Sequence, residues 1–181
     1  MRRLDVSTRP ASEDDLSQVV KIEGYSNRPP WKMDAFRAEL SKKFSHFWVL
    51  TDDETDENVF AYVVFSLPGD QLHVQTLGVE RDSRRKGHAR KLLRDVISFG
   101  LRNEAASVAL EVRKGNEAAI KLYQGLGFVV VHVRKGGYPD GEDAYSMELR
   151  LDRMKIPVDP ETDFDHEESD ARAVRSKKNT V

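Results

Sequence analysis

The chain has 181 residues, with 29 Lys and Arg against 31 Asp and Glu, which gives a formal net charge of −2. This length suffices for one globular domain with a substantial core and is short for two. A charge balance near zero argues against a dedicated nucleic-acid-binding protein, which usually carries a basic excess. Cysteine is absent from the sequence, so a disulfide scaffold, a thiol nucleophile and a cysteine-based zinc site are excluded.

The chain is expected to work away from membranes. No apolar run approaches the roughly 18 residues that a membrane-spanning helix needs. The basic start "MRRLDVSTRP" is followed by no apolar segment of the kind found in secretory signals. We therefore expect a cytoplasmic protein with no membrane partner.

Two helices are predicted near the N-terminus. The segment 10–26, "PASEDDLSQVVKIEGYS", has an N-cap candidate at Ser12, acidic residues in its first turn and an apolar stripe. Pro29 and Pro30 end the helical pattern, and a second short helix is predicted over 33–43.

Strands follow these helices. Segments 46–53 and 58–67 are rich in β-branched and aromatic residues and are separated by an acidic turn. The next segment, "QLHVQTLGVE" at 71–80, alternates first at Leu72 and Val74, but its apolar phase then shifts to Leu77 and Val79. Such a phase shift predicts a β-bulge, a device that redirects backbone groups beside binding sites.

Helices and strands alternate in the second half. A helix with one apolar side is predicted over 87–104, a strand over 107–113, a short helix over 116–127, and strands over 128–134 and 142–151. This order predicts an α/β fold with a parallel strand pair joined by a right-handed crossover. From residue 152 to 181 apolar residues are few and charges many, so we expect a disordered tail there and a folded domain over 1–151.

The basic segment "RRKGHA" at 84–89 lies where the bulged strand passes into the long helix. Gly87 would expose the first backbone N–H groups of that helix, which lack internal acceptors and attract anions. A DNA-contacting patch needs no glycine at this junction, and a solvated run of charges has no use for the bulge. The segment therefore predicts a pyrophosphate site, although neither a P-loop nor a G-x-G-x-x-G motif is present.

Three segments together resemble the GCN5-related N-acetyltransferase (GNAT) superfamily. "RRKGHA" resembles its R/Q-x-x-G-x-G/A acetyl-CoA loop, and "LEVRKGNEAAIKLYQGLGF" resembles its second cofactor segment. "KGGYPDGEDAYSMEL" resembles the C-terminal hairpin of the branch that acetylates protein N-termini, including ribosomal-protein-alanine acetyltransferases. The resemblance implies a mixed sheet of about seven strands with a splayed parallel pair and about four helices.

The resemblance also implies how acetyl-CoA would bind. Its pantetheine arm would lie between the strands at 72–80 and 107–113, with backbone hydrogen bonds from Leu77 and Val79. Asn116 would contact the cofactor, or simply cap the next helix. The remaining positions implied to bind the cofactor are Gly78, Arg84, Arg85, Lys86, Gly87, His88, Ala89 and Tyr123.

Two residues match the catalytic roles of the ribosomal-protein branch. Glu111 would act as general base through a water molecule, and Tyr123 would protonate the departing sulfur. An acid in an apolar central strand needs a partner or a task, so a salt bridge to a neighbouring arginine is the alternative for Glu111. For Tyr123 the alternative is packing against the sheet.

The acceptor side of the site is less well matched. Tyr138 corresponds to the second tyrosine of a pair that lines the entrance for the peptide, but Gly137 stands where the first should be. Trp31 would contact substrate or anchor the core. Glu23, at the end of the first helix, could meet a substrate amine, although as a lone acid at a helix end we expect it to be solvated.

The sequence thus predicts acetyl transfer from acetyl-CoA to the α-amino group of a protein N-terminus, in which a ribosomal protein is one candidate acceptor. Transfer would be direct within a ternary complex, because no cysteine can carry an acyl group. The alternatives are acetylation of a small amine or a lysine side chain, and a non-catalytic module that binds acetyl-CoA. No metal-ligand spacing emerges from the five histidines, and no nucleic-acid partner is expected.

Overall fold

A computed structural model describes residues 6–52 and 57–152 of the chain. The predicted disordered tail, apart from residue 152, lies outside the described residues. Within the described part, none of the helices has the length and apolar character needed to cross a membrane.

Seven strands form one mixed sheet in the order β1-β2-β3-β4-β5-β7-β6. The strands are β1 (Val6–Pro10), β2 (Ser45–Asp52), β3 (Ala61–Ser66), β4 (Gln71–Val79), β5 (Ser107–Arg113), β6 (Val129–Arg134) and β7 (Ala144–Arg150). The helices are α1 (Leu16–Ser26), α2 (Met33–Ser41), α3 (His88–Arg102) and α4 (Glu117–Gln124), and short 3-10 turns cover Glu13–Asp15 and Arg81–Ser83. Among the described strands only β4 and β5 pair in parallel. The predicted α/β class and its mixed sheet are confirmed.

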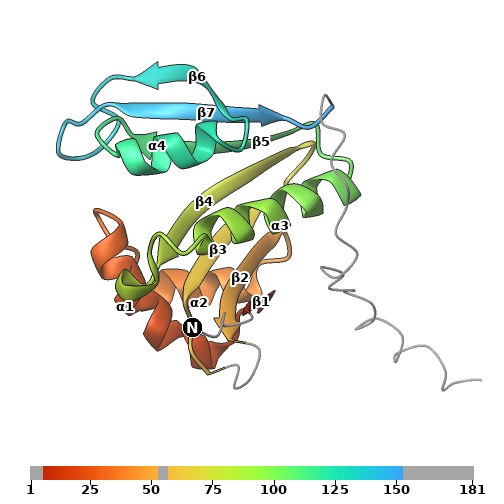
Figure 1. Ribbon diagram of the computed structural model, residues 1–181, viewed down its shortest axis with the longest axis vertical. Coiled ribbons are helices and arrows are strands. Elements are labelled where there is room, and N and C mark those ends of the chain that lie inside the picture. Colours follow the sequence, from red (N-terminus) through yellow and green to blue (C-terminus); the bar gives the residue numbers. More distant parts are fainter. Residues whose placement is uncertain (1–5, 53–56, 153–181) are drawn as a thin grey trace, which may run out of the picture.

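Helices cover both faces of the sheet, with α3 and α4 on one face and α1 and α2 on the other (Figure 1). The alternation of side chains along β2 and β3 supplies both cores. Trp48, Leu50 and Val63 pack with the helix α3, whereas Val49 and Tyr62 pack with α1 and α2. Because β2 and β3 bury apolar side chains on both faces, the segments 46–53 and 58–67 are apolar along most of their length instead of alternating with polar residues.

The predicted bulge lies in β4. Val64 pairs with Thr76, but Phe65 pairs with Val74, so Gln75 is an extra residue on the β4 side. The parallel pairing of β4 with β5 begins at Gln71 and ends where Val74 meets Leu110. Beyond that point the two strands diverge (Figure 1), which confirms the expected splay.

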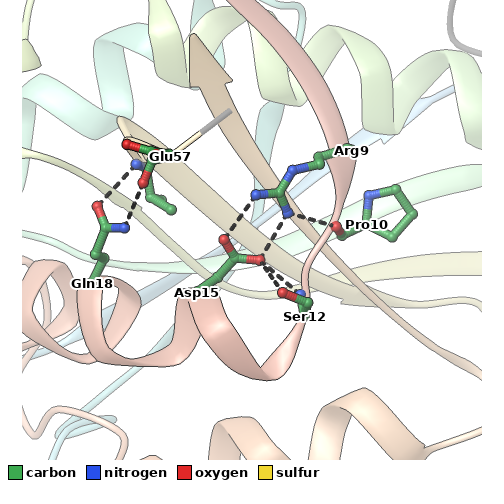
Figure 2. Close-up of polar contacts among 7 residues, drawn as sticks. Arg9, Pro10, Ser12, Asp15, Gln18 and Glu57 are labelled. Atoms are coloured by element: carbon green, nitrogen blue, oxygen red, sulfur yellow. Dashed lines mark hydrogen bonds and ion pairs between the residues drawn. The ribbon is translucent and has the colours of Figure 1, made fainter. Parts of the chain in front are cut away.

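The carboxylate of Asp15, in addition to the predicted N-cap residue Ser12, holds the start of α1 in place. The Ser12 backbone N–H donates to Asp15 Oδ2 at 2.7 Å, and Arg9 donates to both oxygens of Asp15 at 2.8 and 2.9 Å (Figure 2). One turn later, Gln18 Nε2 donates to the Glu57 carbonyl at 2.8 Å (Figure 2). The Gln18 Oε1 accepts the Val59 N–H at 3.1 Å. The first helix is thereby attached to β1 and to the segment that enters β3.

Asp15→Asn should lower the free energy of unfolding by about 1–2 kcal/mol at neutral pH, because it weakens the bonds to Ser12 and Arg9. Burial raises the pKa of Asp15, but the hydrogen bonds from Arg9 and Ser12 outweigh burial and leave the pKa below its usual value. The stabilisation is therefore complete above about pH 3.9 and is lost as pH falls through the lowered pKa. Urea unfolding at a series of pH values should show the gap between the two proteins closing in acid. Asp14→Asn, at an exposed neighbour, is the control, and a gap that stays constant with pH would contradict this role.

Candidate active site

The divergence of β4 and β5 opens a cleft of about 1170 Å³. Residues 74–79 of β4 and the loop before α3 line one side, and residues 110–113 of β5 with the start of α4 line the other. The segments 25–31 and 138–142 contribute the remaining wall. The cleft brings together all the site residues predicted from the sequence except Lys86, which does not line it: Trp31, Leu77, Gly78, Val79, Arg84, Arg85, Gly87, His88, Ala89, Glu111, Asn116, Tyr123 and Tyr138.

One edge of β4 faces this cleft without a strand partner. Leu77, Gly78 and Val79 pair with β3 on their other side, while pairing with β5 has already ended. Gly78 is required here, because a Cβ at this position would lie 2.5 Å from a ring carbon of Tyr62 and 2.9 Å from a methyl of Ile22. The free edge offers backbone groups of the kind that a narrow, extended ligand can bind.

The loop before α3 has the backbone geometry of an anion site. Gly87 has φ +92° and immediately precedes the first residue of the helix, His88. Apart from its two chain neighbours, no described residue has an atom within 4 Å of a Cβ built on Gly87, so the glycine is needed for its left-handed conformation rather than for close packing. The first N–H groups of α3 have no acceptor within the helix and carry its positive dipole end.

Arg84 lies at the junction of this loop with α1. Its Nε donates to the Val79 carbonyl at 3.3 Å and its Nη2 to Ser26 Oγ at 3.4 Å. The guanidinium also lies 5.4 Å from the centre of the Tyr25 ring. A cation is thus held beside the anion site by the strand and helix that meet there.

His88 contributes an aromatic contact rather than a charge. Its ring stacks on Phe60 with centroids 5.5 Å apart. Burial, and secondarily the charge of Lys86, lower the pKa of His88, so the imidazole is neutral near pH 7.

Asn116 and Tyr123 belong to the β5 side of the cleft. Asn116 caps α4, where its side chain accepts the Ala119 N–H at 3.2 Å, and it also lines the cleft; the two interpretations of this residue are therefore compatible. Tyr123 is 8% exposed, and burial raises the pKa of its phenol to about 12, with a smaller contribution from Tyr138. The phenol is thus a protonated donor across the ordinary pH range.

Glu111 is paired with an arginine, as the alternative interpretation of the sequence anticipated. Its Oε2 lies 2.6 Å from Arg134 Nη2, and its Oε1 accepts from Nε at 3.3 Å. About half of each side chain is exposed. Leu110 and Val112 on either side point into the core that contains Tyr123, so the alternation of the strand directs Glu111 to the opposite face of β5.

Glu23 was expected to be solvated, and that expectation is wrong. The residue is 0% exposed, and its carboxylate accepts hydrogen bonds from Tyr62, from Asn27 Nδ2 at 2.5 Å and from the Trp31 N–H at 2.9 Å. A buried carboxylate is tolerated when several donors satisfy it. Glu23 continues the spacing of Leu16 and Val19 on the apolar side of the helix, a signal that could have revealed its burial.

The predicted acceptor residues face the cleft from two loops. The Trp31 ring packs 5.4 Å from that of Phe36, so this residue is a core anchor that also lines the cleft. Tyr138 is half-buried beneath the Arg113 guanidinium, 3.9 Å from its ring centre. A Cβ at Gly137 would lie 2.7 Å from the Ala144 Cβ, so this backbone leaves no room for the tyrosine that the resemblance would place there.

The described residues contain no group of three or more His, Cys, Asp or Glu that could hold a metal ion. The arrangement consists instead of a free strand edge, a helix N-terminus with cations, a neutral phenol and a carboxylate. Such a set can bind an extended phosphate-bearing ligand and transfer protons at its reactive end.

Comparisons with known proteins agree with this geometry. The chain is 34% identical over 157 residues to the N-alpha-acetyltransferase of Saccharolobus solfataricus, covering 79% of this chain and 92% of that protein. It is 30% identical over 140 residues to the Escherichia coli [ribosomal protein bS18]-alanine N-acetyltransferase, covering 76% and 92% respectively.

The solved structure of the Escherichia coli ribosomal-protein-S18-alanine N-acetyltransferase superposes with a TM-score of 0.73, covering 81% of this chain and 94% of that one at 29% identity. Arabidopsis thaliana NAA60 in complex with acetyl-CoA has the same fold, with a TM-score of 0.74 at 20% identity over 82% of this chain and 99% of that one. The model of the acetyltransferase (GNAT) family matches residues 13–128. The chain belongs to the acetyltransferase (GNAT) family.

Proposed function

We propose that this protein transfers the acetyl group of acetyl-CoA to the α-amino group of a protein N-terminus. The observation that carries the proposal is the cleft between β4 and β5, in which a free strand edge leads to a helix N-terminus. The names of the two curated relatives support this acceptor class, since both denote acetylation of α-amino groups. A ribosomal protein is the acceptor that the second relative suggests.

The residues present fit acetyl-CoA. The free edge of β4 at Leu77–Val79 offers backbone groups to the amides of the pantetheine arm, and the N–H groups around Gly87 with Arg84 and Arg85 offer an anion site for the pyrophosphate. Bound acetyl-CoA supplies an acetyl group activated as a thioester. Lys86, which lies outside the cleft lining, acts at most through its charge.

Two residues of this chain each carry out one of the two proton transfers that the reaction requires. Glu111, held by Arg134, accepts the proton of the attacking amine through a water molecule on one face of β5. Tyr123, whose phenol stays protonated up to about pH 12, donates its proton to the departing thiolate from the other face of β5. No cysteine is present to carry the acetyl group, so the transfer is direct.

An acetylation assay over several amine classes tests the proposal. Peptides with a free N-terminus, the same peptides with a blocked N-terminus and an internal lysine, and a polyamine would be compared, and mass spectrometry would locate the acetyl group. We expect product only at free α-amino groups. Product mainly on lysine or on the polyamine would overturn the acceptor assignment and favour the alternative of a lysine side chain or a small amine as acceptor.

Arg84→Ala should weaken acetyl-CoA binding by about tenfold at low salt, because it removes a cation from the pyrophosphate site. The difference from the unmodified protein should shrink as salt is added, since exposed charges are screened. Titration calorimetry at two ionic strengths measures both effects. Arg102→Ala, at the opposite end of α3, is the control, and an unchanged dissociation constant in Arg84→Ala would remove the phosphate assignment.

Tyr123→Phe should lower kcat by about 100-fold or more while acetyl-CoA binding changes little, because only the proton donor is lost. Since the raised pKa of Tyr123 keeps the phenol protonated, this loss should be uniform between about pH 6 and pH 10. Steady-state kinetics and equilibrium binding separate the two quantities. Normal turnover in the variant would show that Tyr123 only packs against the sheet.

Glu111→Gln should lower kcat by about 100-fold while acetyl-CoA binding changes little, because the group that accepts the proton of the amine is lost. Steady-state kinetics and equilibrium binding measure the two quantities. Glu117→Gln, which alters an exposed ion pair on α4, is the matched control. If Glu111→Gln turns over as fast as the control, the pair with Arg134 is structural and another group is the base.

A further inference from the structure

We infer that Arg113 is a positioning residue for the acceptor: it fixes both walls of the mouth through which the acceptor would reach the cleft. The mouth is defined here as the segment 27–31 on one side and the loop 138–142 on the other. This inference rests on the proposed function and extends it to a residue whose role neither the motifs nor the predicted catalytic pair required.

Arg113 organises the loop 138–142 first. As the last residue of β5, it donates from Nη1 to Asp140 Oδ2 at 2.8 Å and to Glu142 Oε2 at 2.7 Å. The face of the guanidinium covers the ring of Tyr138 at 3.9 Å. Glu142 extends the contact, since its other oxygen accepts the Gly115 N–H at 2.9 Å. The loop that presents Tyr138 to the cleft is therefore folded around one side chain.

The opposite wall is attached to the same guanidinium. Arg113 Nη2 donates to the backbone carbonyl of Arg28 at 2.5 Å. Among the hydrogen bonds of the described residues, this is the one that joins the segment 27–31 to β5 and the loop 138–142. Both ends of that segment are held by the buried Glu23, whose carboxylate accepts the Asn27 side-chain amide at 2.5 Å and the Trp31 N–H at 2.9 Å. Arg113 adds the attachment to β5 at Arg28, between these two ends.

The chemistry of this contact requires an arginine. Four acceptor oxygens and one aromatic face surround the side chain, which is only 19% exposed. A planar guanidinium has donors in several fixed directions and a flat face for stacking, whereas an ammonium group is a compact point charge. The hydrogen bonds from Arg113 lower the pKa of both Asp140 and Glu142, so these carboxylates stay ionised and the contacts persist over the working pH range.

The position of Arg113 predicts which kinetic constant it controls. It orients Tyr138 and the segment 27–31, and its guanidinium is engaged by these walls rather than by Glu111 or Tyr123. Loss of the bridge should therefore weaken acceptor binding and leave the proposed cofactor contacts on β4 and at the N-terminus of α3 unchanged. A residue that only stabilised the fold would affect both sites together.

The test compares Arg113→Gln and Arg113→Lys with the unmodified protein, using Arg150→Gln, which breaks an exposed ion pair at the end of β7, as the control. We expect both Arg113 variants to raise the KM for an acceptor peptide by about tenfold, the loss expected for a few charge-assisted bonds, with an unchanged acetyl-CoA dissociation constant. Acrylamide quenching of tryptophan fluorescence supplies a readout that needs no acceptor. Quenching should increase because Trp31, which is already partly exposed, lies in the segment that loses its attachment to β5, while Trp48 is buried at 3% exposure.

The outcomes separate this inference from the proposed function. Absence of acetylation of any peptide by the unmodified protein would overturn the proposed function, yet the quenching comparison would still test the bridge. Unchanged KM and unchanged quenching in Arg113→Gln, or a parallel rise in the acetyl-CoA dissociation constant, would overturn the role of Arg113. If the Arg113 variants do not fold, Asp140→Asn combined with Glu142→Gln removes the charged partners at the exposed side of the bridge, and the same two readouts decide.

Discussion

The site depends on the loss of hydrogen bonding between β4 and β5 beyond Val74 and Leu110. One extra residue, Gln75, shifts the phase of β4, and from there the strand pairs with β3 alone. Backbone groups left at a free edge need a partner, and here they face a cleft rather than a neighbouring strand. The same divergence separates the α3 side, which carries the proposed anion site, from the β5 side, which carries the proposed catalytic residues Glu111 and Tyr123. The bulge, the cleft and the separation of these two sets of residues therefore follow from one interruption of the sheet.

An open sheet must be held together by contacts other than strand pairing, and buried polar side chains do this around the cleft. Glu23 gathers donors from Tyr62, Asn27 and Trp31, which attaches the end of α1 to β3 and to the following loop. Gly78 allows β4 to lie directly against Tyr62. Such a network, once fully satisfied, is rigid because every member loses a partner if one moves. Arg113, which is partly exposed, plays the corresponding part on the β5 side, so the proposed acceptor mouth is framed by a buried glutamate and an arginine.

The sequence predicted those features that depend on local pattern. The change of apolar phase between Val74 and Leu77 predicted the bulge, and Gly87 predicted where the long helix α3 begins. Residues whose partners are distant in the chain were harder to interpret: Glu23 meets Tyr62 39 residues away, and Arg113 meets Arg28 85 residues away. Local patterns do not name such partners, so Arg113 drew no attention. The burial of Glu23 was missed although its spacing on the apolar side of α1 indicated it. Glu111 was intermediate, since its need for a partner was foreseen but the partner, Arg134, was not named.

Hydrogen exchange of the backbone amides with and without acetyl-CoA tests the central claim most directly, namely that the ligand takes the place of a strand along β4. The account predicts slower exchange on adding acetyl-CoA in two segments, residues 75–79 of β4 and residues 85–90 before and within α3, with β6 unchanged. The first effect reports new hydrogen bonds at the free edge, and the second reports an anion at the helix N-terminus. Protection confined to 85–90, or none in either segment, would contradict the claim that the parted strands hold the cofactor.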